Sequence, residues 1–565
     1  MNEASEQATV HGGSQVVRAA KAHGVGTLWT LSGAHVFPIY DAAVGGRASV
    51  EQQPATARAD GGPLRLIDTR HEATAVFAAE ATGKLTRKPG FAVVTAGPGV
   101  TNSVSGVASA AFNASPMVVV GGRAPANRWG TGALQELDHP PLMAPVAKRA
   151  LTVSDPTAIE TELDAAFDLA AAPHRGPVFA DIPMDVLFSH STMGEIRGPG
   201  EHRTEPDGDQ VARVAALLAQ AEHPVVVFGG DIWSGGAEAA AHRFATESGL
   251  PVVLNGMARG VLPRGNRSLV TRARSAAFRG ADLVAVIGTP LDFRLGFGVF
   301  GAPDHPASVV HIADSPEALA AHIDLAAALA GDLATIFDEL LAAYLRHPGR
   351  RDPSRWRSEL RDGAEAAYAQ DQQLLHSDAE QIHPARIYGE LLPRLASDSV
   401  VIGDGGDFVS FAGKYIEPDR PGGWLDPGPF GCLGTGLGYA MAARVARPSS
   451  QVVLLLGDGA AGMSLMDVDT LVRHRLPVVM VVGNNAAWGL EKHPMRFLYG
   501  YDVAADLRPS GYDEVARALG AGGETVTRPD QIGAALDRAF ASGVPYLVNV
   551  ITDTDAAYPR GTTGV

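Results

Sequence analysis

An unbroken apolar run ends in a glycine turn at Val452-Val453-Leu454-Leu455-Leu456-Gly457-Asp458-Gly459. A second run, Val478-Val479-Met480-Val481-Val482, leads to Asn484-Asn485, so that Asn485 follows Asp458 by 27 residues. Runs without polar alternation are typical of strands covered by helices on both faces, as in parallel sheets. The spacing leaves room for one helix between two neighbouring strands, so we expect both turns at one edge of a parallel sheet.

Similar apolar runs recur along the chain, each followed by an alanine-rich stretch of helical composition. They are Phe91–Thr95, Met117–Val120, Val225–Phe228 and Leu283–Ile287. Two polar stretches rich in glycine and proline, residues 197–208 and 347–353, are typical of linkers. We therefore predict an α/β protein of three doubly wound parallel-sheet domains, spanning residues 1–195, 196–350 and 351–565.

The composition argues against several classes of function. The chain has 565 residues and a formal net charge of −16, which does not suit a general binder of nucleic acids or anionic membranes. The single cysteine, Cys432, excludes a disulfide within one chain and a cysteine-based zinc or iron–sulfur site, and it suits a reducing compartment. The N-terminal residues lack a basic and apolar leader, and no apolar stretch approaches the roughly 18 residues of a membrane helix. We expect a cytoplasmic enzyme.

The two turns supply atoms that suit a magnesium-bound phosphate group. The Asp458 carboxylate and the Asn485 side-chain carbonyl are hard oxygen ligands of the kind that Mg²⁺ prefers. The backbone carbonyl of Ala487 offers a third oxygen, and the amides of Gly459 and Ala460 at a helix start offer donors to phosphate. Each turn alone also fits ordinary turn chemistry, because Gly-Asp-Gly and Asn-Asn both favour turns. The spaced pair indicates a binding site.

This pair of turns resembles the thiamine-diphosphate motif of the acetohydroxyacid synthase-like superfamily, and the resemblance extends along essentially the whole chain. Further matching segments, in the order found in that family, are Arg70–Ala75, Thr95–Asn102 with Ser115-Pro116, Gln135–Asp138 and Ala281–Gly288. The resemblance implies an N-terminal pyrimidine-binding domain, a central Rossmann-like domain, and a C-terminal diphosphate-binding domain with a lid-like tail. It also implies thiamine diphosphate and Mg²⁺ as cofactors, and active sites at the subunit interface of a homodimer or homotetramer.

The resemblance assigns roles to individual residues. Glu72 is expected to bond the aminopyrimidine ring and to promote loss of the proton from the cofactor's thiazolium carbon. Leu433 aligns with the bulky apolar residue that bends the cofactor and brings its two rings together. The metal ligands would be Asp458, Asn485 and Ala487, and the other cofactor contacts would be Gly405, Gly457, Gly459, Ala460 and Leu490. Glu72 is also compatible with an acidic first-turn residue behind an Asp68 helix cap, and Leu433 with a core residue.

Finer features indicate the branch of the superfamily. Gly438 stands where acetohydroxyacid synthases usually carry proline, and with Leu291–Gly298 it resembles the branch of oxalyl-CoA decarboxylases and 2-hydroxyacyl-CoA lyases. Leu134-Gln135 replaces the Tyr-Glu pair that oxalyl-CoA decarboxylases tend to carry. Glu491 follows Asn485 by six residues, an offset at which pyruvate decarboxylases place a catalytic glutamate. We expect Glu491 to face the thiazolium in a dry cleft as the first candidate base, with an exposed helix charge as the alternative.

Other residues are candidates for the substrate side of the site. His35 aligns near the reactive face of the cofactor and is the second candidate base, although a structural histidine explains it equally well. Gln135 and Arg560 are candidate substrate contacts; Arg560 lies in a tail that CoA-using relatives close over the substrate, and a frayed terminus is the alternative. A cluster of arginines in the central segment is a further candidate phosphate contact, with solvated surface arginines as the alternative. The cluster consists of Arg259, Arg264, Arg267, Arg272 and Arg274.

These features together favour a thiamine-diphosphate- and Mg²⁺-dependent 2-hydroxyacyl-CoA lyase. The expected substrate is a short or branched acyl-CoA thioester, such as 2-hydroxyisobutyryl-CoA, cleaved to formyl-CoA and an aldehyde or ketone, here acetone. The alternatives are an oxalyl-CoA decarboxylase, an acetolactate synthase or another 2-oxoacid decarboxylase or carboligase, and a nucleotide- or CoA-binding protein without catalysis. The resemblance leaves open whether the central domain binds ADP, FAD or neither.

Overall fold

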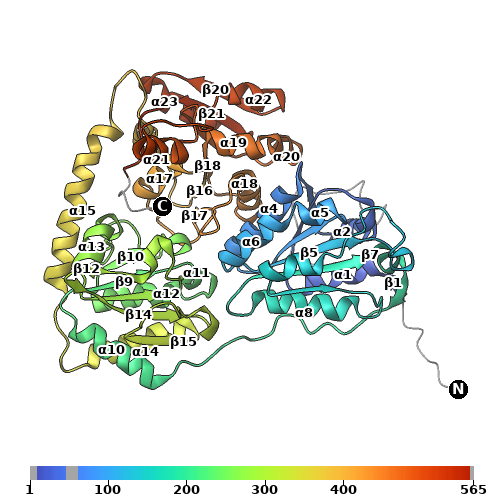
Figure 1. The fold of residues 1–565 in the computed structure, drawn as a ribbon, viewed down its shortest axis with the longest axis horizontal. Helices are drawn as coiled ribbons and strands as arrows, with labels where there is room; N and C mark the ends of the chain where they lie inside the picture. The colour runs from blue at the N-terminus through green and yellow to red at the C-terminus, as the bar shows by residue number, and fades with distance from the viewer. Residues whose placement is uncertain (1–8, 46–61, 560–565) are drawn as a thin grey trace. The chain divides into compact units, whose positions relative to one another are not determined.

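The structure is a computed structural model that describes residues 9–45 and 62–559. Three large parallel β-sheets, one in each of the three predicted segments, are flanked by helices (Figure 1). The chain divides into two compact units. One unit comprises Met1–His202, Phe430–Pro448 and Ser464–Leu476, and the other comprises Arg203–Pro429, Ser449–Met463 and Pro477–Val565.

The N-terminal sheet has six parallel strands in the order β3-β2-β4-β5-β7-β6. These strands are β2 (Thr27–Thr30), β3 (Arg65–Asp68), β4 (Gly90–Val94), β5 (Met117–Arg123), β6 (Arg149–Thr152) and β7 (Pro177–Pro183). The helices of this region are α1 (Gly12–Ala22), α2 (Phe37–Val44), α4 (Glu72–Thr86), α5 (Pro98–Thr101), α6 (Val104–Phe112), α7 (Pro140–Met143), α8 (Ile159–Ala171) and α9 (Met184–Phe188). Helices α1, α2 and α8 pack against one face of the sheet, and α4 covers the other. Strands β1 (Thr9–His11) and β8 (His190–Thr192) form a separate antiparallel pair.

Two later segments complete this unit. Helix α18 (Gly436–Ala446) lies against α4. Helix α20 (Val468–Arg473) lies near β3, to which its polar side chains bond. The helix that bears Glu72 is therefore covered by a second helix from the C-terminal third of the chain.

The central sheet has five parallel strands in the order β10-β9-β11-β14-β15. They are β9 (Pro224–Phe228), β10 (Val252–Leu254), β11 (Leu283–Ile287), β14 (Ser308–Ala313) and β15 (Ala327–Ala330). Helices α10 (Gly208–Gln220), α12 (Glu238–Ser248) and α14 (Leu333–Arg346) cover one face. Helices α13 (Arg274–Gly280) and α15 (Ser354–Leu375) cover the other. Short elements α11 (Asp231–Ser234), β12 (Gly301–Ala302) and β13 (His305–Pro306) lie in the connections.

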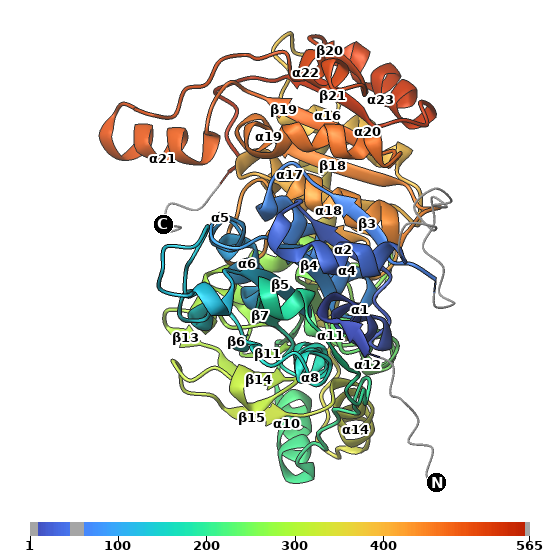
Figure 2. The ribbon, with the colours of Figure 1, turned by 90° about the vertical axis from the view of Figure 1, so that its right-hand side faces the viewer.

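The C-terminal sheet has six parallel strands in the order β17-β16-β18-β19-β21-β20. They are β16 (Val400–Asp404), β17 (Trp424–Leu425), β18 (Val452–Gly457), β19 (Val479–Asn484), β20 (Gly522–Val526) and β21 (Tyr546–Ile551). Helices α16 (Pro384–Leu391), α17 (Asp407–Tyr415) and α23 (Ile532–Ala541) share one core with this sheet. The other helices of this segment are α19 (Asp458–Ser464), α21 (Gly489–Tyr499) and α22 (Tyr512–Ala518). Figure 2 shows α21 standing out from the sheet of its own unit.

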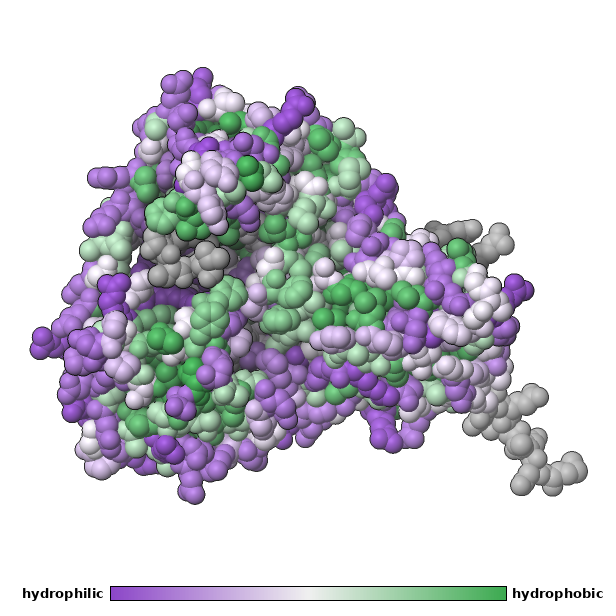
Figure 3. All heavy atoms as spheres, viewed as in Figure 1, coloured by the Kyte–Doolittle hydropathy of each residue, from purple (hydrophilic) through white to green (hydrophobic). Residues whose placement is uncertain are grey.

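The fold confirms the prediction of an α/β protein built on parallel sheets. All residues of the β4, β9, β11 and β19 strands are buried, as expected for sheets covered on both faces. The predicted domain boundaries stay a prediction. Within residues 9–45 and 62–559 no helix has the length and apolar character needed to span a membrane. Hydrophilic and hydrophobic residues are intermixed over the face shown in Figure 3.

Candidate active site

The Gly-Asp-Gly and Asn-Asn turns lie at the same edge of the C-terminal sheet, as predicted. Strands β18 and β19 are adjacent and parallel, and their register pairs Gly457 with Gly483. Asp458 and Asn484 are therefore at the same level, and Asn485 is one residue further on. Strand β18 leads directly into helix α19, and strand β19 leads into a short loop before helix α21. Carboxyl ends of parallel strands are the usual ligand sites of α/β proteins.

Asp458 is buried, and one of its two carboxylate oxygens has no hydrogen-bond donor among the described residues. Its side chain is only 2% exposed, and Oδ1 accepts a hydrogen bond from the N–H of Gly459 at 3.1 Å. Oδ2 is buried and accepts no hydrogen bond from any of the described residues. Burial raises the pKa of Asp458 to about 6, although the amides of Gly459, Ala487 and Ala486 partly offset this effect. A buried carboxylate oxygen without a donor fits a site for a cation.

The loop after β19 brings further oxygen atoms to this edge. Asn485 Oδ1 accepts the N–H of Ala487 at 3.2 Å, and the Asn485 carbonyl accepts the Thr554 hydroxyl at 2.8 Å. Ala486 has a φ of 53°, in the left-handed region that few side chains adopt readily. The adjoining Asn484 is buried and bonds Asn549, which anchors the loop to β21. Asp458, Asn485 and the carbonyl of Ala487 are thus a donor set that fits Mg²⁺.

Glycines at this edge allow close approach of the backbone. Gly405 has a φ of 128°, and a Cβ on it would lie 3.1 Å from the nitrogen of Gly457 and 3.6 Å from Cβ of Ala460. A Cβ on Gly459 would lie 2.4 Å from the Trp488 ring. Both glycines are therefore required by the local geometry. The predicted cofactor contacts Gly405, Gly457 and Ala460 lie close together at this edge.

Leu490 and Glu491 lie in the first turn of α21. The Leu490 side chain packs on Gly406, where a Cβ would lie 2.4 Å from its Cδ1 atom. Glu491 is exposed, whereas its neighbour Lys492 is buried and paired with Asp506. The expectation that Glu491 faces the thiazolium in a dry cleft stays a prediction, because the expected site lies at a subunit interface and the exposure is that of one chain. Leu490 and Lys492 anchor the first turn of α21, and the Glu491 side chain between them is exposed among the described residues.

Glu72 occupies a buried position at the start of α4. It is 7% exposed, and Nδ2 of Asn102 donates a hydrogen bond to its Oε2 at 3.1 Å. The N-cap of α4 is His71, whose Nδ1 accepts the N–H of Ala73 at 3.1 Å. The alternative of an Asp68 helix cap is therefore wrong. Asp68 ends β3 and bonds other residues, as described below.

The side chains of His35 and Gln135 both bond the hydroxyl group of Thr95. Nδ1 of His35 lies 3.1 Å from Oγ1 of Thr95, and the Thr95 hydroxyl donates to Oε1 of Gln135 at 3.3 Å. Burial lowers the pKa of His35, so this imidazole is neutral at pH 7. A nearby buried histidine, His139, accepts the N–H of Gly97 at 3.0 Å and so supports the loop that carries Thr95. Sequence reasoning linked His35 and Gln135 to the site separately and missed the hydroxyl that joins them.

Leu433 belongs to the same compact unit as Glu72 and is half-buried. Gly438, five residues later, is where α18 approaches α4 most closely. A Cβ on Gly438 would lie 2.8 Å from the carbonyl oxygen of Thr74 and 3.0 Å from Cβ of Phe77. The glycine is therefore explained by helix packing alone, which weakens its use as a marker of the reaction.

The arginine cluster of the central segment is largely used inside the protein. Arg259 donates to the carbonyls of Gly413 and Ile416, and burial lowers its pKa. Arg272 pairs with Glu417 and stacks on Tyr368. These two arginines join the central and C-terminal parts of one unit, so the expectation of a phosphate contact is wrong for them.

The remaining candidates fall into two groups. Glu72, His35, Gln135 and Leu433 belong to one compact unit, and the residues of the two strand-end turns, with Gly405, Leu490 and Glu491, belong to the other. Arg560 lies outside the described residues.

Comparison with known proteins agrees with this arrangement. Three family models match in order: thiamine pyrophosphate enzyme, N-terminal TPP binding domain (residues 10–142); central domain (residues 211–340); and C-terminal TPP binding domain (residues 404–550). Thiamine pyrophosphate is another name for thiamine diphosphate.

Named relatives cover nearly the whole chain. A "probable acetolactate synthase" of Mycobacterium bovis and an "acetolactate synthase large subunit IlvG" of Mycobacterium tuberculosis are each 48% identical over 561 residues, 98% of this chain and 97% of the relative. Human "2-hydroxyacyl-CoA lyase 2" is 32% identical over 592 residues, 96% of this chain and 90% of the relative. The chain therefore belongs to the thiamine pyrophosphate enzyme family and is a thiamine-diphosphate-dependent enzyme.

Proposed function

We propose that this enzyme is a 2-hydroxyacyl-CoA lyase that cleaves short or branched 2-hydroxyacyl-CoA thioesters to formyl-CoA and an aldehyde or ketone. The observation that carries the proposal is Glu491, an exposed acid in the first turn of α21, six residues after the candidate metal ligand Asn485. A free carboxylate beside the metal-binding loop can take a proton from a 2-hydroxyl group. Similarity to 2-hydroxyacyl-CoA lyase 2 over most of the chain supports the same activity.

The cofactor would be held at the edge of the C-terminal sheet. Asp458, Asn485 and the carbonyl of Ala487 would bind Mg²⁺, and the amides of Gly459 and Ala460 would bond the diphosphate. When bound, thiamine diphosphate supplies a nucleophilic carbon that can also stabilise the electron pair left by carbon–carbon cleavage. Glycine at 405 and 457 leaves room for the cofactor close to the backbone, and Leu490 provides an apolar contact.

The proton-handling residues have distinct tasks. The buried Glu72 carboxylate, oriented by Asn102, would bond the aminopyrimidine ring, and Leu433 would hold the two rings of the cofactor close together. Glu491 takes the proton of the substrate's 2-hydroxyl group. His35 is the second candidate for that role, because a neutral imidazole can accept a proton at pH 7.

Two further residues would contact the substrate. Gln135 is fixed through Thr95 beside His35 and offers its amide to the acyl group. Arg560 in the C-terminal tail would meet a phosphate of CoA. The central domain is a site for ADP in this proposal. The enzyme acts as a homodimer or homotetramer in which a partner subunit covers Glu491, and its single cysteine suits the cytoplasm.

The second candidate is an acetolactate synthase or another carboligase of 2-oxoacids. It is favoured by the two mycobacterial relatives, which are 48% identical to this chain. The charge of Glu491 counts against it, because synthases usually carry an apolar residue at this offset. Oxalyl-CoA decarboxylation is less favoured, because Leu134 and Gln135 replace its usual Tyr-Glu pair.

A product assay distinguishes these activities. The purified protein, saturated with thiamine diphosphate and Mg²⁺, is incubated in parallel with 2-hydroxyisobutyryl-CoA, oxalyl-CoA and pyruvate. The proposal predicts formyl-CoA and acetone from the first substrate and little acetolactate from the third. Acetolactate formation without formyl-CoA would establish the second candidate instead. The Glu72→Gln variant controls for contaminating activity.

A further inference from the structure

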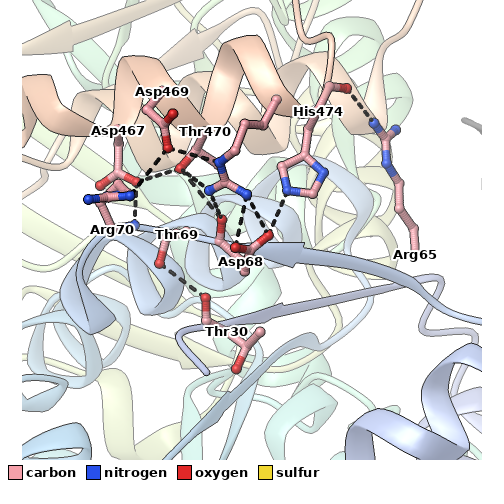
Figure 4. A network of polar contacts seen from close by, with 10 residues as sticks. Thr30, Arg65, Asp68, Thr69, Arg70, Asp467, Asp469, Thr470 and His474 are labelled. Carbon is pink, nitrogen blue, oxygen red and sulfur yellow. Dashed lines mark hydrogen bonds and ion pairs between the residues drawn. The ribbon is translucent and has the colours of Figure 1, made fainter. Parts of the chain in front are cut away.

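The turn that carries Glu72 is bonded to a distant segment of the same compact unit through a polar network (Figure 4). The network joins Asp68 and Arg70, which precede Glu72, to residues 467–474, which include α20. The residues of that segment are Asp467, Asp469, Thr470, Arg473 and His474. Sequence reasoning gave none of these residues a role beyond the mistaken Asp68 cap.

Asp467 is the buried centre of this network. It is 2% exposed, and its Oδ1 accepts the backbone N–H of Arg70 at 2.8 Å and the hydroxyl of Thr470 at 2.9 Å. Arg70 precedes Glu72 by two residues. The carboxylate of Asp467 therefore holds the backbone just before Glu72 and links it to the start of α20.

The carboxylate of Asp68, at the end of β3, holds the other end of the same turn. Arg473 Nη1 donates to both carboxylate oxygens of Asp68 at 2.9 Å, and Arg473 Nη2 donates to the Asp68 carbonyl at 2.9 Å. His474 Nε2 lies 2.9 Å from Asp68 Oδ1. Two carboxylates, one on each segment, thus fix the turn at two points. A rigid-body shift of the turn would break both sets of bonds.

We propose that Asp467 is a positioning residue that sets the orientation of the Glu72 carboxylate. Asn102 bonds only one oxygen of Glu72, so the direction of its side chain depends on where the first turn of α4 begins. Asp467 determines that position through the N–H of Arg70, two residues before Glu72. A misplacement of about 1 Å at a reacting group can cost about 100-fold in rate. This inference rests on the proposed role of Glu72.

The test measures the cofactor's thiazolium proton directly, without substrate. The variants Asp467→Ala, Asp467→Asn and Asp469→Ala are saturated with thiamine diphosphate and Mg²⁺, and deuterium exchange at the thiazolium carbon is followed by NMR. Asp467→Ala is expected to slow exchange about tenfold to 100-fold, with cofactor affinity within about threefold of wild type. Asp467→Asn keeps an acceptor for the N–H of Arg70 and should restore exchange to within about threefold.

Asp469→Ala is the matched control. Asp469 bonds Arg473 and lies 3.6 Å from the side chain of Arg70, but it is partly exposed, whereas Asp467 is buried and accepts the backbone N–H of Arg70. It should leave exchange within about twofold of wild type. A structural role alone would lower the melting temperature of both alanine variants without a selective loss of exchange.

Several results would overturn the proposal. They are normal exchange in folded Asp467→Ala, equal slowing in Asp469→Ala, and no recovery in Asp467→Asn. If Asp467→Ala does not fold, Thr470→Val decides, because it removes the hydroxyl that donates to Oδ1 of Asp467 and should slow exchange about threefold to tenfold; normal exchange would overturn the proposal. Glu72→Gln is run in parallel. Normal exchange in Glu72→Gln removes the proposed role of Glu72, whereas slow exchange there with normal exchange in Asp467→Ala removes only the role of Asp467.

Discussion

The turn that carries Glu72 and the helix that carries Glu491 present two acids in opposite surroundings. Glu72 is buried, bonded by Asn102 and preceded by a turn that Asp68 and Asp467 fix in place. Glu491 is exposed at the start of a helix that stands out from its sheet (Figure 2). One acid is buried and oriented by its own chain, and the other is exposed among the residues that the structure describes.

The difference indicates how each acid is used. A group that must bond one fixed atom of a cofactor gains from a rigid position, because orientation is supplied before the reaction. A group that must reach a substrate which enters and leaves gains from an open position. We therefore expect substitutions around Glu72 to affect the state of the cofactor and substitutions at Glu491 to affect turnover alone.

The largest effect is expected for Glu72→Gln. Loss of the carboxylate should lower turnover by about 100-fold or more, because proton transfer by a positioned group contributes about 10² to 10⁴ in rate. The measurement is the steady-state rate with saturating thiamine diphosphate and Mg²⁺. Glu359→Gln, at an exposed position of α15, is the control and should behave as wild type. Equal rates for the two variants would contradict the contrast drawn here.

A smaller loss is expected for Glu491→Gln. Turnover should fall by about tenfold to 100-fold while the affinity for thiamine diphosphate stays within about twofold. The matched control is Glu514→Gln, because Glu514 holds the same third position in α22 and is also exposed. Turnover and cofactor titrations are measured on the same samples. Loss of cofactor binding in Glu491→Gln would mean that this acid belongs to the cofactor site.

The packing of α18 on the Glu72 helix can be tested at Gly438. Gly438→Ala should destabilise the protein by about 1–3 kcal/mol, because the new Cβ overlaps the backbone of α4. Gly363→Ala is the control, since Gly363 in α15 has open space around it, and an exposed helix should gain about 0.5–1 kcal/mol from alanine. Thermal or urea unfolding measures both. An increase in stability for Gly438→Ala would show that α18 is not tightly packed there.

The smallest effect is a pH-dependent one at Asp68. Burial alone would raise the pKa of Asp68, but hydrogen bonds from His474 and Arg473 outweigh it and lower the pKa to about 2. The lowered pKa stabilises the folded state above the ordinary value of 3.8, and this contribution is lost as the pH falls toward 2. Asp68→Asn should therefore cost about 1 kcal/mol or less at pH 7.

Unfolding of wild type and Asp68→Asn at pH 7, 5 and 3 checks this prediction. The difference in stability should be smaller at pH 3 than at pH 5. A difference that grows as the pH falls would contradict the depressed pKa. Asp530→Asn, an exposed acid paired with Arg528 far along the chain, is the control.

The parallel sheets and the strand-end site were predictable from the sequence because both depend on local patterns. Unbroken apolar runs such as Val452–Leu456 identify strands buried on both faces, and a strand–helix–strand spacing brings Asp458 and Asn485 to one edge. Glu72 was predictable only through the family resemblance.

The contacts that orient Glu72 were not predictable, because they join residues far apart in sequence. Asp467 bonds Arg70 across 397 positions, and no local pattern marks it. The alternative interpretation of Glu72 takes Asp68 as the helix cap, because acids favour that position, yet His71 caps the helix and Asp68 pairs with Arg473 instead. Gly438 indicates a branch of the superfamily by resemblance, whereas its contacts with α4 explain it by packing.

The left-handed backbone at Ala486 limits which side chains can be introduced there to test the size of the substrate's acyl group. Asparagine and glycine adopt such dihedral angles readily, but valine, leucine and phenylalanine do not. A series of ever larger side chains at this position would distort the peptide that carries the Ala487 carbonyl before it filled any space. Loss of activity in such a series would therefore report a displaced metal ligand, and the size limit for substrates is better mapped by varying the thioester.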